Sequence, residues 1–135
     1  MASRDFKTVQ AAERAVKILY LKATIAGSGA PTLVADDSLG IKSITRNGAG
    51  DYSILLGTPS GNTDKYPKLL YTNGVLLDPD AEDLQMQIDT DSVSSSGLVK
   101  ILTIARDSSG DAAAADPSSG ATISMIFHVK NSSVK

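Results

Sequence analysis

In the stretch Ile41-Lys-Ser-Ile-Thr-Arg-Asn-Gly-Ala-Gly-Asp-Tyr-Ser-Ile-Leu-Leu56, two short segments with alternating apolar residues flank Asn47-Gly48-Ala49-Gly50. Asn-Gly supplies the positive φ angles that a tight hairpin turn needs. Tyr52, Ile54 and Leu56 fall on one face of the second segment, as alternation in a strand requires. The stretch therefore predicts a β-hairpin with strands at 41–46 and 51–56, joined by a turn at Asn47–Gly50.

Strand periodicity continues on both sides of this hairpin. Leu84, Met86 and Ile88 alternate with polar residues, and the C-terminal segment 121–129 repeats the pattern. In segment 17–25, Ile18 and Tyr20 make the second face apolar too. Segment 98–105 is apolar on both faces, which is typical of a central strand or one covered by another subunit. Short strands separated by turn residues predict an all-β fold, an antiparallel β-sandwich or small barrel.

Three further segments carry local signals. Residues 57–67 are rich in Pro, Gly, Asn and Asp, which predicts a long polar loop. Asn73-Gly74 lies between the apolar runs 68–72 and 75–78 and predicts a second hairpin. The four alanines at 112–115 are compatible with one helical turn, which Asp116-Pro117 would end at once.

The N-terminal residues differ from the rest of the chain. In residues 4–15, Phe6 and Val9, followed by Val16, approximate helical spacing with polar residues between them. Ser3 suits the start of such a helix as its N-cap. We therefore expect a short helix or arm over 1–15 and a single β-domain over 16–135. A helix of about three turns is marginal alone, so it must pack on its own domain or on a neighbour.

Composition excludes several classes of function. The 135 residues include 13 Lys and Arg against 15 Asp and Glu, a net charge of -2, which argues against nucleic-acid binding. The absence of cysteine excludes disulfides, thiolate metal sites and cysteine nucleophiles. The most apolar early run, 16–26, is eleven residues long and holds two lysines, too short and too charged to span a membrane. The N-terminus also lacks the apolar core of a signal peptide.

Candidate catalytic and metal sites are weak. His128 is the sole histidine, and no Gly-x-Ser-x-Gly motif accompanies it, so a Ser-His-Asp site is not expected. The acidic run 78–83 places oxygens at the first, third and fifth positions of a calcium loop. However, Asp83 occupies the place of the turn glycine, and Asp89 the place of the bidentate Glu. We expect neither an enzyme nor a cofactor, and an irregular calcium site at 78–83 is left open.

Two segments resemble a known group of proteins. The run Gly40-Ile-Lys-Ser-Ile-Thr-Arg-Asn-Gly-Ala-Gly-Asp-Tyr-Ser-Ile-Leu-Leu56 is similar to a pattern that opens the β-domain of small virion proteins of tailed bacteriophages. The ending Asp116-Pro-Ser-Ser-Gly-Ala-Thr-Ile-Ser-Met-Ile-Phe-His-Val-Lys-Asn-Ser-Ser-Val134 resembles the closing strand of the same group. Together they cover about a quarter of the chain. The matching residues are turn glycines and strand alternations, so no catalytic residue follows from the resemblance.

The resemblance implies a non-enzymatic virion structural protein, most concretely an outer capsid cement or decoration protein assembled in the host cytoplasm. Its implied partners are the major capsid protein or other virion subunits, and further copies of itself, often as a trimer. For this interface we expect Phe6, Val9 and Val16 from the arm and Leu98, Lys100, Leu102 and Ile104 from the apolar strand. A tail, collar or fibre component is the nearest alternative. A receptor- or glycan-binding module, with an aromatic groove near Tyr66 and Tyr71, is the alternative from another class.

Overall fold

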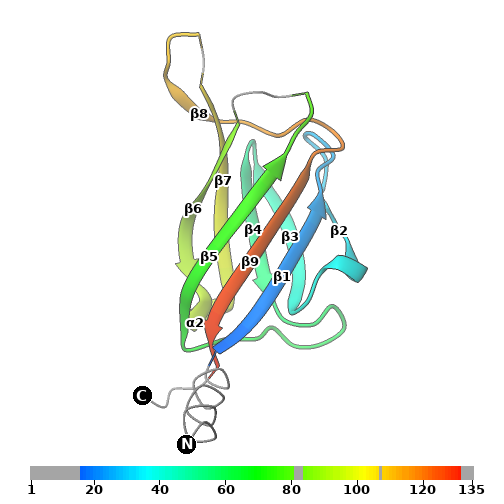
Figure 1. Cartoon of the computed structure of the whole chain (residues 1–135), viewed down its shortest axis with the longest axis vertical. Coiled ribbons are helices and arrows are strands. Elements are labelled where there is room, and N and C mark those ends of the chain that lie inside the picture. The colour runs from blue at the N-terminus through cyan, green and yellow to red at the C-terminus, as the bar shows by residue number, and fades with distance from the viewer. Residues whose placement is uncertain (1–15, 81–83, 107, 132–135) are drawn as a thin grey trace, which may run out of the picture.

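The fold consists of two antiparallel sheets packed face to face (Figure 1). The computed structural model describes residues 16–80, 84–106 and 108–131. Its elements in chain order are β1 (Val16–Thr24), β2 (Thr32–Leu33), η1 (Ala35–Asp37), β3 (Ile41–Gly48), β4 (Asp51–Leu56), β5 (Lys68–Leu77), β6 (Gln85–Ser92), α2 (Val93–Ser96), β7 (Leu98–Arg106), β8 (Ala112–Ala114) and β9 (Thr122–Lys130). The predicted all-β sandwich is confirmed. The arm predicted over residues 1–15 lies outside the described residues and stays a prediction.

The first sheet has the strand order β2-β1-β9-β5 and lies in front in Figure 1. The C-terminal strand β9 is central: it pairs with β1 from Val16↔Lys130 to Thr24↔Thr122, and with β5 on its other side. Its alternation, predicted for segment 121–129, puts Ile123, Met125 and Phe127 inside. The N-terminal and C-terminal strands of the described domain are thus hydrogen-bonded neighbours.

The second sheet has the order β3-β4-β7-β6, and β8 pairs with the far end of β7. β7 contains the segment 98–105, which is apolar on both faces, and it lies between β4 and β6. It buries Val99, Ile101 and Thr103 completely. The helical turn α2 connects β6 to β7 and ends at Gly97, whose φ of 68° closes the turn.

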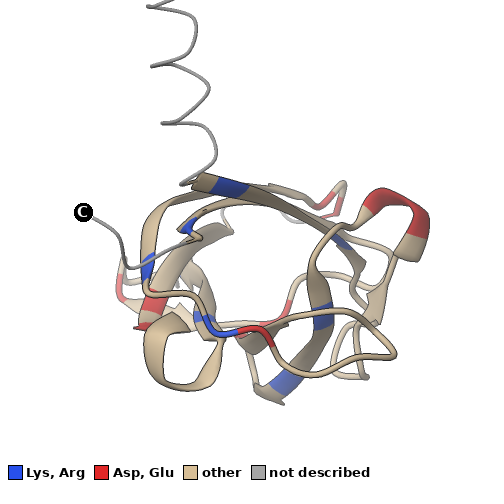
Figure 2. Ribbon diagram, turned by 90° about the horizontal axis from the view of Figure 1, so that it is seen from below, with Lys and Arg blue, Asp and Glu red and all other residues tan. Residues whose placement is uncertain are grey.

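The core lies between the sheets, which curve around a common interior when the molecule is viewed end-on (Figure 2). Its largest fully buried side chains come from both sheets and include Leu19, Tyr52, Ile54, Ile101 and Phe127. Positions of both charge signs are distributed around the ribbon in this view. Because the inner sides of both sheets form the core, the outward-facing side chains form the surfaces that are available for binding.

The turn of the first hairpin is shorter than predicted. β3 continues through Asn47 and Gly48, and the connection is made by Ala49 and Gly50. The positive φ belongs to Gly50, at 65°, while no described non-glycine residue has one. A Cβ on Gly50 would lie 2.5 Å from the carbonyl oxygen of Thr103 and 2.6 Å from the nitrogen of Ala115. The close approach of β7 and residue 115 thus fixes the turn at Gly50.

The second predicted hairpin is wrong. β5 runs unbroken from Lys68 to Leu77 through Asn73 and Gly74. Gly74 faces the interior, where a Cβ would overlap Cε of Met86 and lie 2.6 Å from Cγ of Met125. Its role is to leave room for these two methionines between the sheets, because both cannot share that space with a side chain.

The alanine run does not form the helical turn with which its composition is compatible. Ala112, Ala113 and Ala114 form β8, which pairs with Arg106, Ala105 and Ile104 of β7. Pairing with β7 satisfies backbone groups that an isolated helical turn would leave open, which explains why it prevails over the helix propensity of alanine. The resulting hairpin extends beyond the body of the sandwich (Figure 1).

Candidate interaction surfaces

The four interface residues predicted on β7 share one face. Leu98, Lys100, Leu102 and Ile104 alternate with the buried Val99, Ile101 and Thr103 and point away from the core; all four are half-buried. We call these four residues the β7 face. The structure therefore brings together the strand residues that the sequence singled out, on the outer side of the second sheet.

Lys100 places charge in the middle of the β7 face. Its Nζ lies 2.9 Å from a carboxylate oxygen of Asp51 and 3.8 Å from one of Asp89. The hydrogen bond to Asp51 raises the pKa of Lys100. Because the two neighbouring strands supply the counter-charges, the lysine is held within the face, where it lies between Leu98 and Leu102 along the strand.

Val16, the third residue of the predicted arm set, lies on the other sheet. It is half-buried at the start of β1 and points outward, alternating with the buried Leu19 and Leu21 side. Phe6 and Val9 lie outside the described residues. The structure thus separates Val16 from the β7 face, and their joint role in one interface stays a prediction.

Val16 belongs to a larger apolar surface that sequence reasoning missed. The outer side of the first sheet carries what we call the apolar face, formed by Val16, Ile18, Tyr20, Tyr71, Val75, Leu77, Ile126 and His128. Tyr71 is 53% exposed, and Val75 and Leu77 are each 66% exposed. The register places polar Asn73, Ser124 and Lys22 among them, and exposed apolar side chains gathered on one sheet mark protein interaction sites.

The strand register aligns the apolar face in rows across three strands. One row is Ile18, His128 and Tyr71, and the next is Tyr20, Ile126 and Asn73. The rings of His128 and Tyr71 meet edge to face, with centroids 5.6 Å apart and planes at 85°. A shallow hollow of about 210 Å³ lies beside them, lined by Asn73, Val75, Ser124 and Ile126 among others.

The sequence contained a signal for this face. Ile18 and Tyr20 make both sides of β1 apolar, and Ile126 interrupts the polar side of β9. On β5 the signal was hidden, because the predicted hairpin at Asn73-Gly74 assigned Tyr71 and Val75 to different strands. Only the observed register places these residues from three strands side by side.

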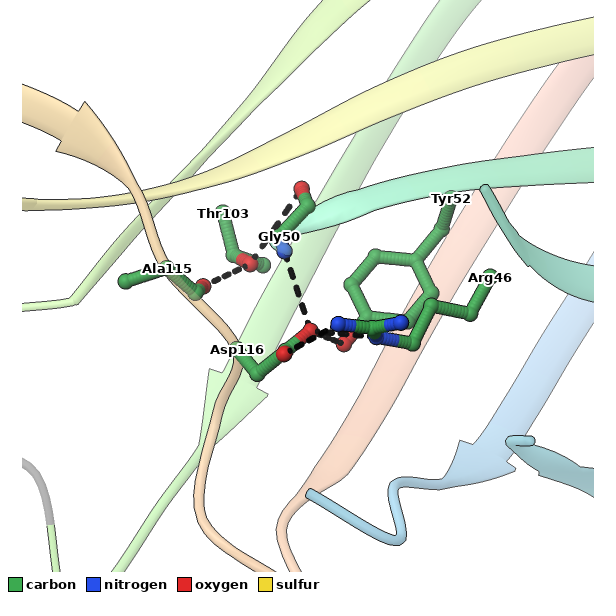
Figure 3. A network of polar contacts seen from close by, with 6 residues as sticks. All are labelled: Arg46, Gly50, Tyr52, Thr103, Ala115 and Asp116. Atoms are coloured by element: carbon green, nitrogen blue, oxygen red, sulfur yellow. Dashed lines mark hydrogen bonds and ion pairs between the residues drawn. The ribbon is translucent and has the colours of Figure 1, made fainter. Parts of the chain in front are cut away.

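The strongest polar cluster lies around Asp116, which follows β8 (Figure 3). Its carboxylate accepts hydrogen bonds from Nε of Arg46 at 2.9 Å and from Nη2 at 2.7 Å. The backbone N–H of Gly50 and the hydroxyl of Tyr52 donate to Oδ1 at 3.0 and 3.1 Å. Beside it, the Thr103 hydroxyl donates to the carbonyl oxygen of Ala115 at 2.6 Å.

Electrostatics in this cluster favour a fixed protonation state. Arg46 and the other donors lower the pKa of Asp116 to about 2, although partial burial opposes this effect. Burial and the bond to Asp116 raise the pKa of Tyr52. Asp116 is therefore ionised and Tyr52 neutral at ordinary pH, and both are already engaged in hydrogen bonds. The arrangement joins the β3–β4 hairpin to the segment before β9. Its donors are hydrogen-bonded to the Asp116 carboxylate within the cluster.

The structure also places the other candidate residues from the sequence, namely the acidic run and the two tyrosines. Asp78, from the acidic run, accepts hydrogen bonds from the N–H of Asp80 at 3.1 Å and of Ser118 at 2.7 Å, while residues 81–83 lie outside the described residues. Within residues 16–80, 84–106 and 108–131, no three His, Asp or Glu side chains gather as a metal site. Tyr66 is buried under Lys17, whereas Tyr71 is exposed on β5.

No helix in the described part of the chain has the length and apolar character to cross a membrane. Comparison with protein families, with curated proteins and with solved structures finds no match for this chain.

Proposed function

We propose that the protein is a non-enzymatic structural subunit of a tailed-phage virion, most concretely an outer capsid cement protein, which binds its neighbours through the outer faces of its sheets. The observation that carries the proposal is the apolar face, because exposed Tyr20, Tyr71, Val75 and Leu77 side chains gather on one sheet. Apolar area of this kind gains stability when a neighbouring protein removes it from water.

The sequence resemblance at 40–56 and 116–134 supports the virion setting. The polar cluster supports a structural role for these segments. Arg46 lies in the first segment and Asp116 in the second, and their ion pair holds the two together. A cement protein without disulfides needs long-range bonds of this kind, because it must stay folded on the particle surface.

The β7 face supplies the contact proposed for the shell. Leu98, Leu102 and Ile104 keep part of their surface exposed around the paired Lys100. An apolar centre with a neutralised charge matches the core of protein interfaces, which are depleted in free charges. We assign the capsid contact to this face and self-association to the apolar face.

Co-sedimentation with empty capsids of the parent phage tests the proposal. The expected result is binding at hundreds of copies per particle. A dozen or fewer copies would indicate a tail, collar or fibre component instead. Binding to glycans without capsid affinity would contradict the proposal and favour a receptor-binding module.

A matched pair of variants locates the contact. Leu102→Asp places a charge at the centre of the β7 face and is expected to reduce capsid binding at least about tenfold, the effect of about 1.4 kcal/mol. Ser60→Asp adds the same charge in the exposed loop between β4 and β5 and is expected to bind normally. Equal binding by both variants would exclude the β7 face as the contact.

A further inference from the structure

We infer that the apolar face of one copy binds the N-terminal arm, residues 4–15, of a second copy, so that the protein assembles by exchange of arms. This inference deepens the proposed function by naming the partner of the apolar face. The partner is another molecule of the same chain.

The dimensions of the two surfaces agree. Residues 4–15, if helical, span about 18 Å at 1.5 Å per residue. On β5 the apolar face runs from Tyr71 to Leu77, about 20 Å at 3.3 Å per residue. A single short helix lying along the strands would therefore cover the exposed rows from His128 to Leu77.

The chemistry of the two surfaces also agrees. Phe6 and Val9 recur at helical spacing and give the arm one apolar side. The apolar face offers aromatic edges at Tyr71 and His128 and the shallow hollow between Val75 and Ile126. An aromatic anchor beside such a hollow is the usual centre of a helix-in-groove contact. Ala12, three residues after Val9 and near the same side of a helix, is small enough for the rest of the arm to approach closely.

The path of the chain favours a second copy over the same molecule. Val16 begins β1 and already lies on the apolar face. For the arm to cover its own face, the chain would have to reverse direction immediately before Val16. Residues 6–15 contain no Gly, Pro, Asn, Asp or Ser, the residues that form tight reversals. An arm that continues away from its own sheet instead reaches the equivalent face of a neighbour.

Arm exchange has a direct consequence for the assembly. Each copy donates one arm and offers one apolar face, so the contact is heterologous and closes when copies form a ring. This geometry is compatible with the cyclic oligomers expected for cement proteins, and it leaves the β7 face of every copy free for a different partner.

Disulfide trapping in the full-length protein tests the inference, and the absence of native cysteine makes every introduced thiol unique. Two single variants, Val9→Cys carrying a size tag and Val75→Cys without it, are mixed and oxidised. Tyr20→Cys replaces Val75→Cys in a parallel mixture, so that each half of the face is sampled. The control partner is Gln87→Cys, which is exposed on the outer side of the second sheet.

The expected result is a mixed covalent dimer of tagged and untagged chains with the Val75 or Tyr20 partner, and at least about tenfold less with the Gln87 partner, corresponding to about 1.4 kcal/mol of preference. No mixed dimer with either face variant would overturn the inference, as would equal trapping at Gln87. A Val9→Cys/Val75→Cys double variant that closes only within one chain would place the arm on its own sheet and also overturn it. The trapping needs no capsid, so it fails or succeeds independently of the proposed function.

Discussion

Asp116 holds Arg46 by two parallel hydrogen bonds, at 2.9 and 2.7 Å, across 70 positions of sequence. The same carboxylate receives the hydroxyl of Tyr52, which is fully buried, and the N–H of Gly50. One side chain therefore joins the start of β4, the end of β3 and the segment that leads into β9. Bidentate pairs of this kind add geometric specificity as well as energy.

Replacing Asp116 by alanine is expected to destabilise the domain by about 2–3 kcal/mol, because buried donors lose their acceptor. Urea unfolding, followed by circular dichroism, measures the change. Asp37→Ala is the matched control, since Asp37 pairs with Lys22 at 2.9 Å on the exposed surface; it should cost less than about 1 kcal/mol. Equal costs for the two variants would refute a special role of Asp116.

The same carboxylate predicts a pH dependence. Its pKa is lowered to about 2 in the folded protein from the ordinary value of 3.8, so the folded state favours the ionised form. The stabilisation is fully present above about pH 4 and is lost as pH falls towards about 2. The stability difference between the native chain and Asp116→Asn should shrink over this window. A difference that stays constant down to pH 2 would show that ionisation of Asp116 does not matter.

The hairpin turn gives a prediction with an internal control. Gly50→Ala should destabilise by at least about 2 kcal/mol, because φ is positive and the new Cβ would meet Thr103 and Ala115. Gly48→Ala should be nearly neutral, since nothing lies within 4 Å of its Cβ position. Thermal unfolding of both variants checks this. A larger loss of stability from Gly48→Ala than from Gly50→Ala would contradict this assignment and place the turn at Asn47-Gly48.

Deleting residues 1–15 should leave the β-domain folded, because described residues of both sheets, from Leu19 to Val129, build a shared core. The expected result is an unchanged β-sheet circular dichroism spectrum with a lower molar mass in solution and weaker attachment to capsids. Light scattering after size exclusion gives the mass. An unfolded truncation product would mean that the arm belongs to the core of its own domain.

Local alternation of apolar and polar residues predicted the strands that have one side in the core and the other side in water. The alternation of Ile123, Met125 and Phe127 requires a dry side and a wet side, and β9 has both. The same reasoning failed at Asn73-Gly74, because the need for space beside Met86 and Met125 is a property of the packed structure. The strand at Ala112–Ala114 was missed because its stability comes from pairing with β7.

Of the two candidate surfaces, likewise, one could be predicted from the sequence and the other could not. The β7 face was predicted because four alternating residues on one strand, Leu98 to Ile104, define it. The apolar face was missed because it joins Ile18, Ile126 and Tyr71 from three strands, and their alignment depends on the register. The role of Asp116 could not be predicted from the sequence either, since no local pattern links it to Arg46.

Side-chain footprinting of the free and capsid-bound protein tests most directly whether the chain works by fitting against its neighbours. Carbene labelling at Leu98, Leu102 and Ile104 should fall on the particle, while labelling at the exposed loop residues Pro59 and Lys65 should stay the same. Unchanged labelling of the β7 face on saturated capsids would contradict the account.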